Sequence, residues 1–139
     1  MKLVRNVLIA TTTLLCLVGL SMAATDIQSQ PVKFAKGHSS ATLKGTIKGD
    51  QTIDYTLRAK AGQTMSVTLK TGNGANYFNV LPPGSNDVAI FVGSTGGNEW
   101  TGTLRADGEY KVRVYLMRSA ARRNETASYT LTVGITGTP

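Results

Sequence analysis

Four segments of this chain carry an apolar side chain at every second position. They span residues 53–57, 65–69, 110–116 and 129–135, and threonine, serine or charged residues fill most positions between the apolar ones. A period of two places successive side chains on opposite faces of a β-strand, so each segment predicts a strand with one face in a core and the other in water. No segment after residue 24 shows a convincing helical period. The alternation is typical of antiparallel sheets.

Turn-forming residues separate these segments at short intervals. Glycine, proline, asparagine or aspartate cluster near residues 49–50, 61–62, 72–74, 82–86, 96–98 and 107–108. Less regular strands are expected at residues 32–35, 41–48, 77–81, 87–92 and 99–104. About eight short strands with this spacing predict an all-β chain, folded as an antiparallel β-sandwich or a flattened barrel.

The first 23 residues have the three parts of a secretory signal peptide. Lys2 and Arg5 give a positive start, residues 7–20 are mostly apolar, and Ser21-Met22-Ala23 is a small-x-small cleavage site. The apolar run is shorter than the ~20 residues that span a bilayer as a helix, so no stable membrane insertion is expected. We expect cleavage after Ala23, a flexible leader at residues 24–31, a single β-sandwich domain at residues 32–139, and a periplasmic or secreted protein.

Cleavage would change the composition in two ways that matter for function. The only cysteine, Cys16, lies inside the predicted signal peptide, so the mature chain would have no disulfide, no thiol nucleophile and no cysteine metal site. Without Lys2 and Arg5, 13 basic residues stand against 8 acidic ones, a net charge of +5. These charges are spread out except near the C-terminus, and we expect no nucleic-acid partner.

The chain offers few residues for catalysis. His38 is the only histidine, and it lies between two predicted strands, where a loop histidine is the simpler interpretation. Asp50 and Asp54 share one strand face, but they are interpreted as a turn former and a solvated charge rather than as the carboxylate pair that glycoside hydrolysis needs. We therefore expect no enzyme, no cofactor and no metal.

The most informative segment is residues 115–126, YLMRSAARRNET. Arg118, Arg122 and Arg123 follow a strongly patterned strand and precede the last one. A guanidinium group suits carboxylate recognition, because its planar fork donates two parallel hydrogen bonds. Functional loops on rigid scaffolds are common. A solubilising loop, or one held by an internal contact to Glu125, is the alternative.

Two strings resemble a known family. Residues 34–41, FAKGHSSA, and 45–49, GTIKG, are similar to the N-terminal part of the periplasmic inhibitors of g-type lysozyme. Residues 108–114, GEYKVRV, followed by Arg118, Ala121, Arg122 and Asn124, resemble the same family. A looser likeness extends to the i-type lysozyme inhibitors and to the β-sandwich modules that follow secreted peptidases.

The resemblance implies a β-sandwich whose loops block the substrate cleft of a lysozyme, g-type being favoured and i-type an alternative. It implies contacts from Arg118 and Arg122, and from a Ser-Gly-x-Tyr turn that is here Asp107, Gly108, Glu109 and Tyr110. Arg123 joins the expected contacts as the third arginine of the same segment. His38 and Ser39, in the shared N-terminal string, are secondary candidates. In this mechanism a guanidinium pairs with the catalytic acid of the lysozyme.

A second class of function is also compatible with the sequence. The same basic segment, together with the outward row of Lys111, Arg113 and Tyr115, would suit a non-catalytic envelope module that binds an anionic or glycan ligand. The oligomeric state is left open.

Overall fold

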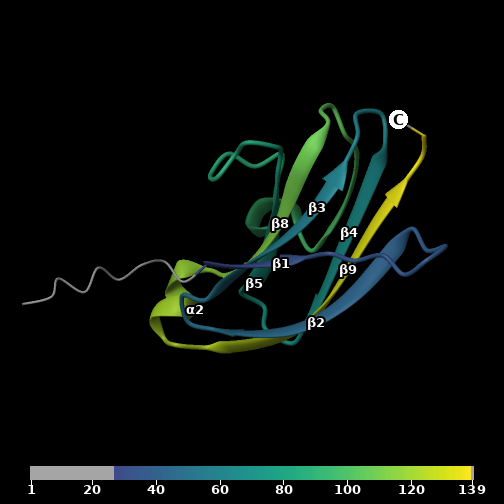
Figure 1. Cartoon of the computed structure of the whole chain (residues 1–139). Coiled ribbons are helices and arrows are strands. Elements are labelled where there is room, and N and C mark those ends of the chain that lie inside the picture. Colours follow the sequence, from purple (N-terminus) through teal and green to yellow (C-terminus); the bar gives the residue numbers. More distant parts are fainter. Residues whose placement is uncertain (1–26, 139) are drawn as a thin grey trace, which may run out of the picture.

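The computed structural model describes residues 27–138, which form nine strands and two one-turn helices in two packed sheets (Figure 1). The predicted signal peptide, its Cys16 and the first residues of the predicted leader lie outside the described residues. No helix in the described part of the chain is long and apolar enough to cross a membrane.

Each sheet joins strands that are distant in sequence. The five-stranded sheet has the order β1 (Ile27–Pro31), β3 (Thr52–Ala59), β8 (Gly108–Leu116), β5 (Asn76–Leu81), β6 (Phe91–Val92). The four-stranded sheet has the order β2 (Ser40–Lys48), β9 (Thr126–Thr136), β4 (Thr64–Thr71), β7 (Glu99–Thr103). Neighbouring strands are antiparallel except β1 and β3, which run parallel. Helix α1 (Gly93–Gly96) precedes β7, and helix α2 (Arg118–Arg122) connects β8 to β9. The predicted all-β sandwich is confirmed.

The core lies between the two sheets and consists largely of the residues that the alternation predicted. Side chains from β3, β4, β8 and β9 fill it and are almost inaccessible to solvent; they include Tyr55, Leu57, Met65, Val67, Leu69, Tyr110, Val112, Val114, Leu116, Tyr129, Leu131 and Val133. Phe78 and Val80 of β5 join them. Burying a large apolar side chain stabilises a fold by about 1.5–3 kcal/mol, so this layer drives the association of the sheets.

Two tyrosines connect the sheets through the core. The Tyr55 and Tyr129 hydroxyls lie 2.7 Å apart in a hydrogen bond, and their rings meet edge to face with centroids 6.4 Å apart. Gly45 lies opposite Tyr129 in the register, and a Cβ at this position would collide with the Tyr129 hydroxyl. The glycine is therefore required to make room for the pair.

The tyrosine pair predicts a loss of stability at alkaline pH. Burial raises the pKa of both Tyr55 and Tyr129 above the usual value. Above pH ~10 the unfolded chain releases phenolic protons that the folded protein retains, so the free energy of unfolding should fall by up to about 1.4 kcal/mol per pH unit for each tyrosine. Urea unfolding between pH 9 and about 11.5 measures this slope, and Tyr55→Phe should reduce it. Titration of Tyr55 and Tyr129 in the folded protein at the usual phenol pKa of ~10 would contradict the prediction.

Three sequence expectations are wrong near the edges of the sheets. Part of the expected flexible leader, Ile27–Pro31, is strand β1, whereas residues 32–35 form no strand. All five β1 side chains are exposed, so the strand is held by backbone pairing to β3 and leaves no apolar alternation in the sequence. The strand expected at 87–92 is reduced to Phe91–Val92, because residues 82–90 form a loop over the outer face of β8.

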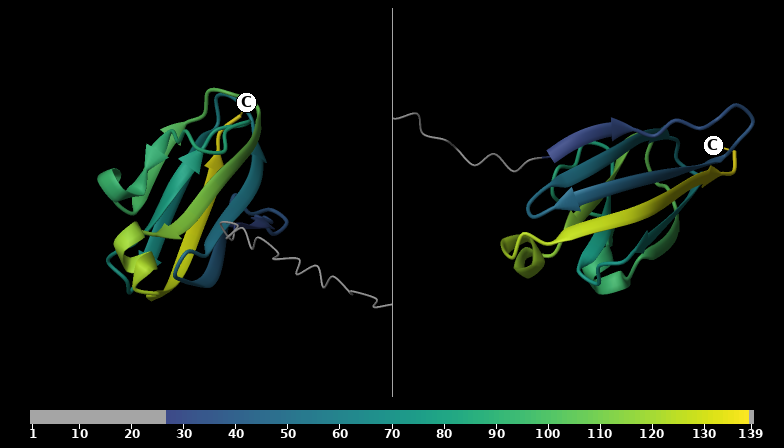
Figure 2. Two further views of the ribbon diagram at one scale, coloured as in Figure 1. Left: turned by 90° about the vertical axis from the view of Figure 1, so that its left-hand side faces the viewer. Right: turned by 90° about the horizontal axis from the view of Figure 1, so that it is seen from below.

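The connecting loops gather at two opposite ends of the sandwich. Along β2 and β9, Lys48 pairs with Thr126 at the end that holds α2, and Ser40 pairs with Gly134 at the other. Nine strand residues separate these ends by about 26 Å. Figures 1 and 2 show α2 at one end and the C-terminus at the other. Only residues in loops at the same end of the sandwich can contribute to one site.

Candidate functional site

Helix α2 is a single turn that is fixed to the core. Ala120 and Ala121 are buried, and the amide of Ala121 donates to the carbonyl of Met117 over 2.9 Å. The amide of Met117 in turn donates to the carbonyl of Ala75 at the start of β5, again over 2.9 Å. The turn ends at Asn124, which has a positive φ of 58° and donates its amide to the Ala121 carbonyl. The small buried alanines anchor the backbone, so the arginines around them must point outward.

The three arginines of this segment have different surroundings. Arg123 donates through Nε to Glu125 Oε2 over 2.7 Å. Glu125 also accepts from Asn73, and these two hydrogen bonds, that of Arg123 first, lower the pKa of the Glu125 carboxyl. Within the described residues, Arg118 and Arg122 make no side-chain hydrogen bond or ion pair, and both are exposed. Their spacing of four puts both on one side of the turn. The internal contact to Glu125 therefore occupies only Arg123.

The predicted Asp107–Tyr110 contact is not at this end of the molecule. Gly108 begins β8 and Leu116 ends it, so the 107–110 turn and α2 lie at opposite ends of that strand. Asp107 is exposed, but its Oδ1 accepts from the amide of Ala61 over 2.7 Å. Tyr110 is 1 % exposed and donates its hydroxyl to the carbonyl of Ala106 over 2.6 Å. Tyr110 is therefore corrected from a contact residue to a core residue, as its alternation also allowed.

The secondary candidates also lie away from α2. His38 and Ser39 are exposed in the loop before β2, and the Ser39 carbonyl accepts from the amide of Ile135 near the end of β9. That position is the end of the sandwich opposite α2. The structure thus brings Arg118, Arg122 and Arg123 together and separates them from His38, Ser39, Asp107 and Gly108.

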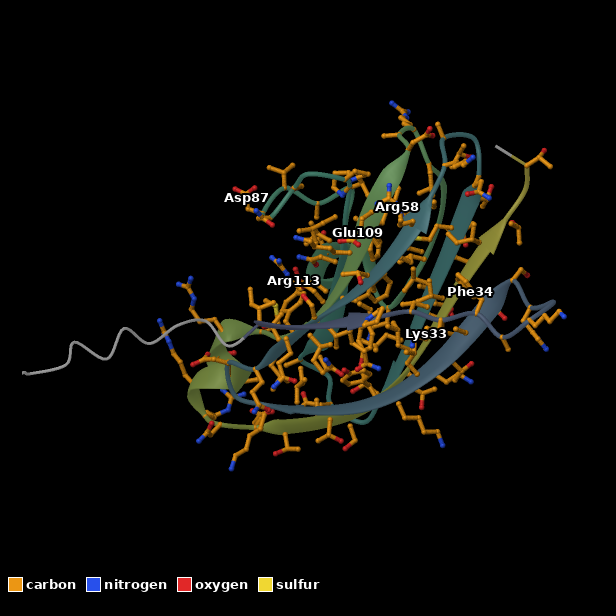
Figure 3. The ribbon with its side chains drawn as sticks, viewed as in Figure 1. Lys33, Phe34, Arg58, Asp87, Glu109 and Arg113 are labelled. Atoms are coloured by element: carbon orange, nitrogen blue, oxygen red, sulfur yellow. The ribbon has the colours of Figure 1, made fainter. Side chains whose placement is uncertain are left out.

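The outward row on β8 is occupied by contacts within the protein. Arg113 donates through Nε to Asp54 Oδ1 over 2.7 Å and through a terminal nitrogen to Oδ2 over 3.0 Å. This pairing raises the pKa of Arg113, although burial opposes it. Lys111 donates to Asn86 over 2.7 Å, and the Tyr115 hydroxyl donates to Asn79 over 3.0 Å. Figure 3 shows Arg113 beside the loop that carries Asp87.

The same contact corrects the expectation for Asp54. Its position on the outward face of β3 predicted a solvated charge, but only 3 % of the residue is exposed. Arg113 is its cross-strand partner, and Arg113 also donates to the carbonyl of Asn86, which brings the 82–90 loop over the pair. Asp54 is thus a structural carboxylate of the five-stranded sheet.

A groove of about 680 Å³ lies beside α2 and was not expected from the sequence. Arg118 is on one wall, and the rest of the lining comes from separate parts of the chain: Ile27, Gly49, Asp50, Thr52, Asn79, Val92, Ser94, Arg113, Tyr115, Leu116, Met117 and Ala121. No local motif joins these residues, so sequence patterns could not have found the groove. Among the described residues, no group of three histidine, cysteine, aspartate or glutamate side chains could hold a metal ion.

Comparison with known proteins identifies relatives in sequence and in structure. No family model matches the chain. The inhibitor of g-type lysozyme from Escherichia coli K12 is 35% identical over 106 residues, which cover 75% of this chain and 78% of the relative. The crystal structure of Aeromonas hydrophila PliG, a periplasmic inhibitor of g-type lysozyme, is 46% identical with a TM-score of 0.75, over 80% of this chain and 98% of that one.

Two further crystal structures show how far the similarity extends. A mutant of the Escherichia coli PliG is 33% identical with a TM-score of 0.61, over 80% of this chain and 99% of that one. The pre-peptidase C-terminal domain of a Bacillus anthracis collagenase is only 16% identical, with a TM-score of 0.51 over 80% of this chain and 95% of that one, and shares the fold alone. The curated Escherichia coli relative is named as an inhibitor of g-type lysozyme, and the two PliG structures are described as periplasmic inhibitors of that enzyme. The chain is therefore a non-catalytic periplasmic or secreted protein that belongs to the family of inhibitors of g-type lysozyme.

Proposed function

We propose that this protein inhibits a lysozyme of the g-type by inserting the outward side of α2 into the substrate cleft of the enzyme. The family supports the class of target. The observation that carries the proposal is the exposure of Arg118 and Arg122 on one side of a turn whose alanines are buried in the core. The turn presents two cations that the described part of the protein does not neutralise.

The chemistry of glycoside hydrolysis explains why a cation would inhibit. A glycosidase needs one carboxyl group that is protonated and can donate its proton to the leaving oxygen. A guanidinium placed against that carboxyl favours the charged form and lowers its pKa. The enzyme would then hold its acid deprotonated while the inhibitor excludes the polysaccharide. No bond is made or broken by the inhibitor itself.

A cell-wall lysis assay with the purified mature protein tests the proposal. The protein is titrated against g-, i- and c-type lysozymes in parallel, and we expect inhibition of the g-type enzyme at micromolar protein or below. Stronger inhibition of the i-type enzyme would keep the mechanism and change the target class. Absence of inhibition of all three at micromolar protein would contradict the proposal.

The envelope-module alternative has lost part of its support. It relied on the basic segment at 115–126 and on the row of Lys111, Arg113 and Tyr115, and each side chain of that row has a partner within the protein. Binding to isolated peptidoglycan that weakens steeply with salt, together with no effect on any lysozyme, would restore it.

A further inference from the structure

Three exposed apolar side chains line the groove beside α2. In the described part of the chain, the large apolar residues that are exposed are Ile27, Val88, Ile90, Val92 and Met117. Ile27, Val92 and Met117 line the groove, and we call these three the apolar rim. Val88, which is 70 % exposed, does not line it. Apolar residues that share a groove with polar ones can contribute to an interaction site, whereas apolar residues scattered singly over a surface need no explanation.

The groove combines this rim with one cation that has no partner among the described residues. Arg118 lies on the wall next to Met117, while the guanidinium of Arg113 is already paired with Asp54. Asp50 is the only carboxylate among the lining residues, and no ion pair in the described part of the chain neutralises it, so it would repel an acidic group placed beside it. Arg118 is the cation in the lining that is free, among the described residues, to attract one, and the groove therefore suits a segment that places its acidic side chain at Arg118 and an apolar side chain against the rim.

The apolar rim also bears on how strongly Arg118 could bind a carboxylate of a partner. Ion pairs between exposed groups contribute little, because water and salt screen them. Charge pairs at protein interfaces become strong where surrounding side chains exclude water. Arg118 alone, on an open surface, would therefore bind weakly.

We propose that the apolar rim receives an apolar side chain of the lysozyme, so that a neighbouring lysozyme carboxylate meets Arg118 out of contact with water. This inference rests on the proposed function and adds a second contact to it. In this proposal Val92 and Met117 contribute to the affinity and specificity of lysozyme binding. Each of these two rim residues immediately precedes a helix. Val92 precedes α1 and Met117 precedes α2, and both have non-helical backbone angles.

These positions allow a test that spares the fold. Threonine and serine are favoured immediately before a helix, because their oxygen can accept from the first free amides. Val92→Thr and Met117→Ser remove apolar surface from two residues that are each 39 % exposed. The matched control is Val88→Thr, which makes the same chemical change outside the groove. Thermal unfolding checks that all variants are folded.

The experiment measures inhibition of the g-type lysozyme by the mature protein and each variant. The double variant Val92→Thr, Met117→Ser should inhibit about tenfold more weakly, as expected for lost apolar contacts. Val88→Thr should stay within about twofold of the unchanged protein, as scattered surface groups do. Met117→Ser should also weaken inhibition less in an Arg118→Ala background, because the two side chains act on one site.

The outcomes separate this inference from the proposed function. If the double variant inhibits within about twofold of the unchanged protein while Arg118→Ala weakens inhibition strongly, the rim is overturned and the proposed function stands. An equal loss from Val88→Thr would also overturn it, because the effect would not belong to the groove. If the unchanged protein inhibits no lysozyme, both fall together.

Discussion

Replacing either Arg118 or Arg122 by alanine should weaken inhibition of the target lysozyme by about 30-fold or more. Truncating one partner of a buried interfacial charge pair costs about 2–5 kcal/mol, and the lower value corresponds to this factor. Both side chains are exposed and lie outside the core, so the variants should fold normally. Inhibition constants from the lysis assay, with a direct binding measurement, give the comparison.

Two control variants, one at an arginine and one at a lysine, make this test specific. Arg123 lies in the same segment but is paired with Glu125, so Arg123→Ala should have a much smaller effect than its neighbours. Lys44→Ala, on the outer face of the four-stranded sheet, should change inhibition by less than about fivefold, as rim charges do. Equal losses at Arg118, Arg122 and Lys44 would mean that net charge, and not α2, determines binding.

A conservative change separates charge from geometry. Arg118→Lys keeps the positive charge but loses the planar fork that can bind both carboxylate oxygens. We expect partial recovery relative to Arg118→Ala, and full recovery would show that the fork is not used.

Replacing Asp54 by alanine should lower the free energy of unfolding by about 3 kcal/mol. The change leaves the Arg113 guanidinium partly buried without the carboxylate that accepts its two hydrogen bonds. It also weakens the attachment of the 82–90 loop, since Arg113 is what donates to the Asn86 carbonyl. Urea unfolding, analysed as a two-state transition, measures the loss.

Two further variants show where that loss comes from. Asp54→Asn keeps the shape and one acceptor oxygen, so it should lose less than Asp54→Ala. The double variant Asp54→Ala, Arg113→Ala should lose less than the two single variants combined, because removing both partners leaves no buried charge unpaired. If Asp54→Ala lowered the free energy of unfolding by less than about 0.5 kcal/mol, the Asp54–Arg113 pair would contribute no more than an exposed surface ion pair, and the prediction would be wrong.

The strands were predictable where one of their faces is buried. In β8, Tyr110, Val112 and Val114 alternate with polar residues, and they are core residues in the structure. Strand β1 was not predictable, because all its side chains are exposed and only its backbone pairs with β3. Hydrophobic patterning reports burial of side chains and says nothing about backbone hydrogen bonds at an edge.

The site was predictable only in part for a similar reason. The arginines of α2 stand out because three of them occur within six residues of a connecting segment. The Asp107–Tyr110 turn was placed with them, although β8 carries it to the opposite end of the sandwich. The groove was missed because the sheet order, and not spacing along the chain, places Val92 and Met117 in the lining of one groove.

The sequence by itself determined the all-β class, the inward faces of the long strands and the cationic segment between β8 and β9. These properties depend on local alternation and local composition, which a chain carries before it folds. Only the tertiary structure decided that Arg123 is bound internally while Arg118 and Arg122 face outward, that Asp54 is buried, and that an apolar rim lies beside α2. Each of these depends on which distant strands pair and which loops share an end, and that is set by the packing of the whole core.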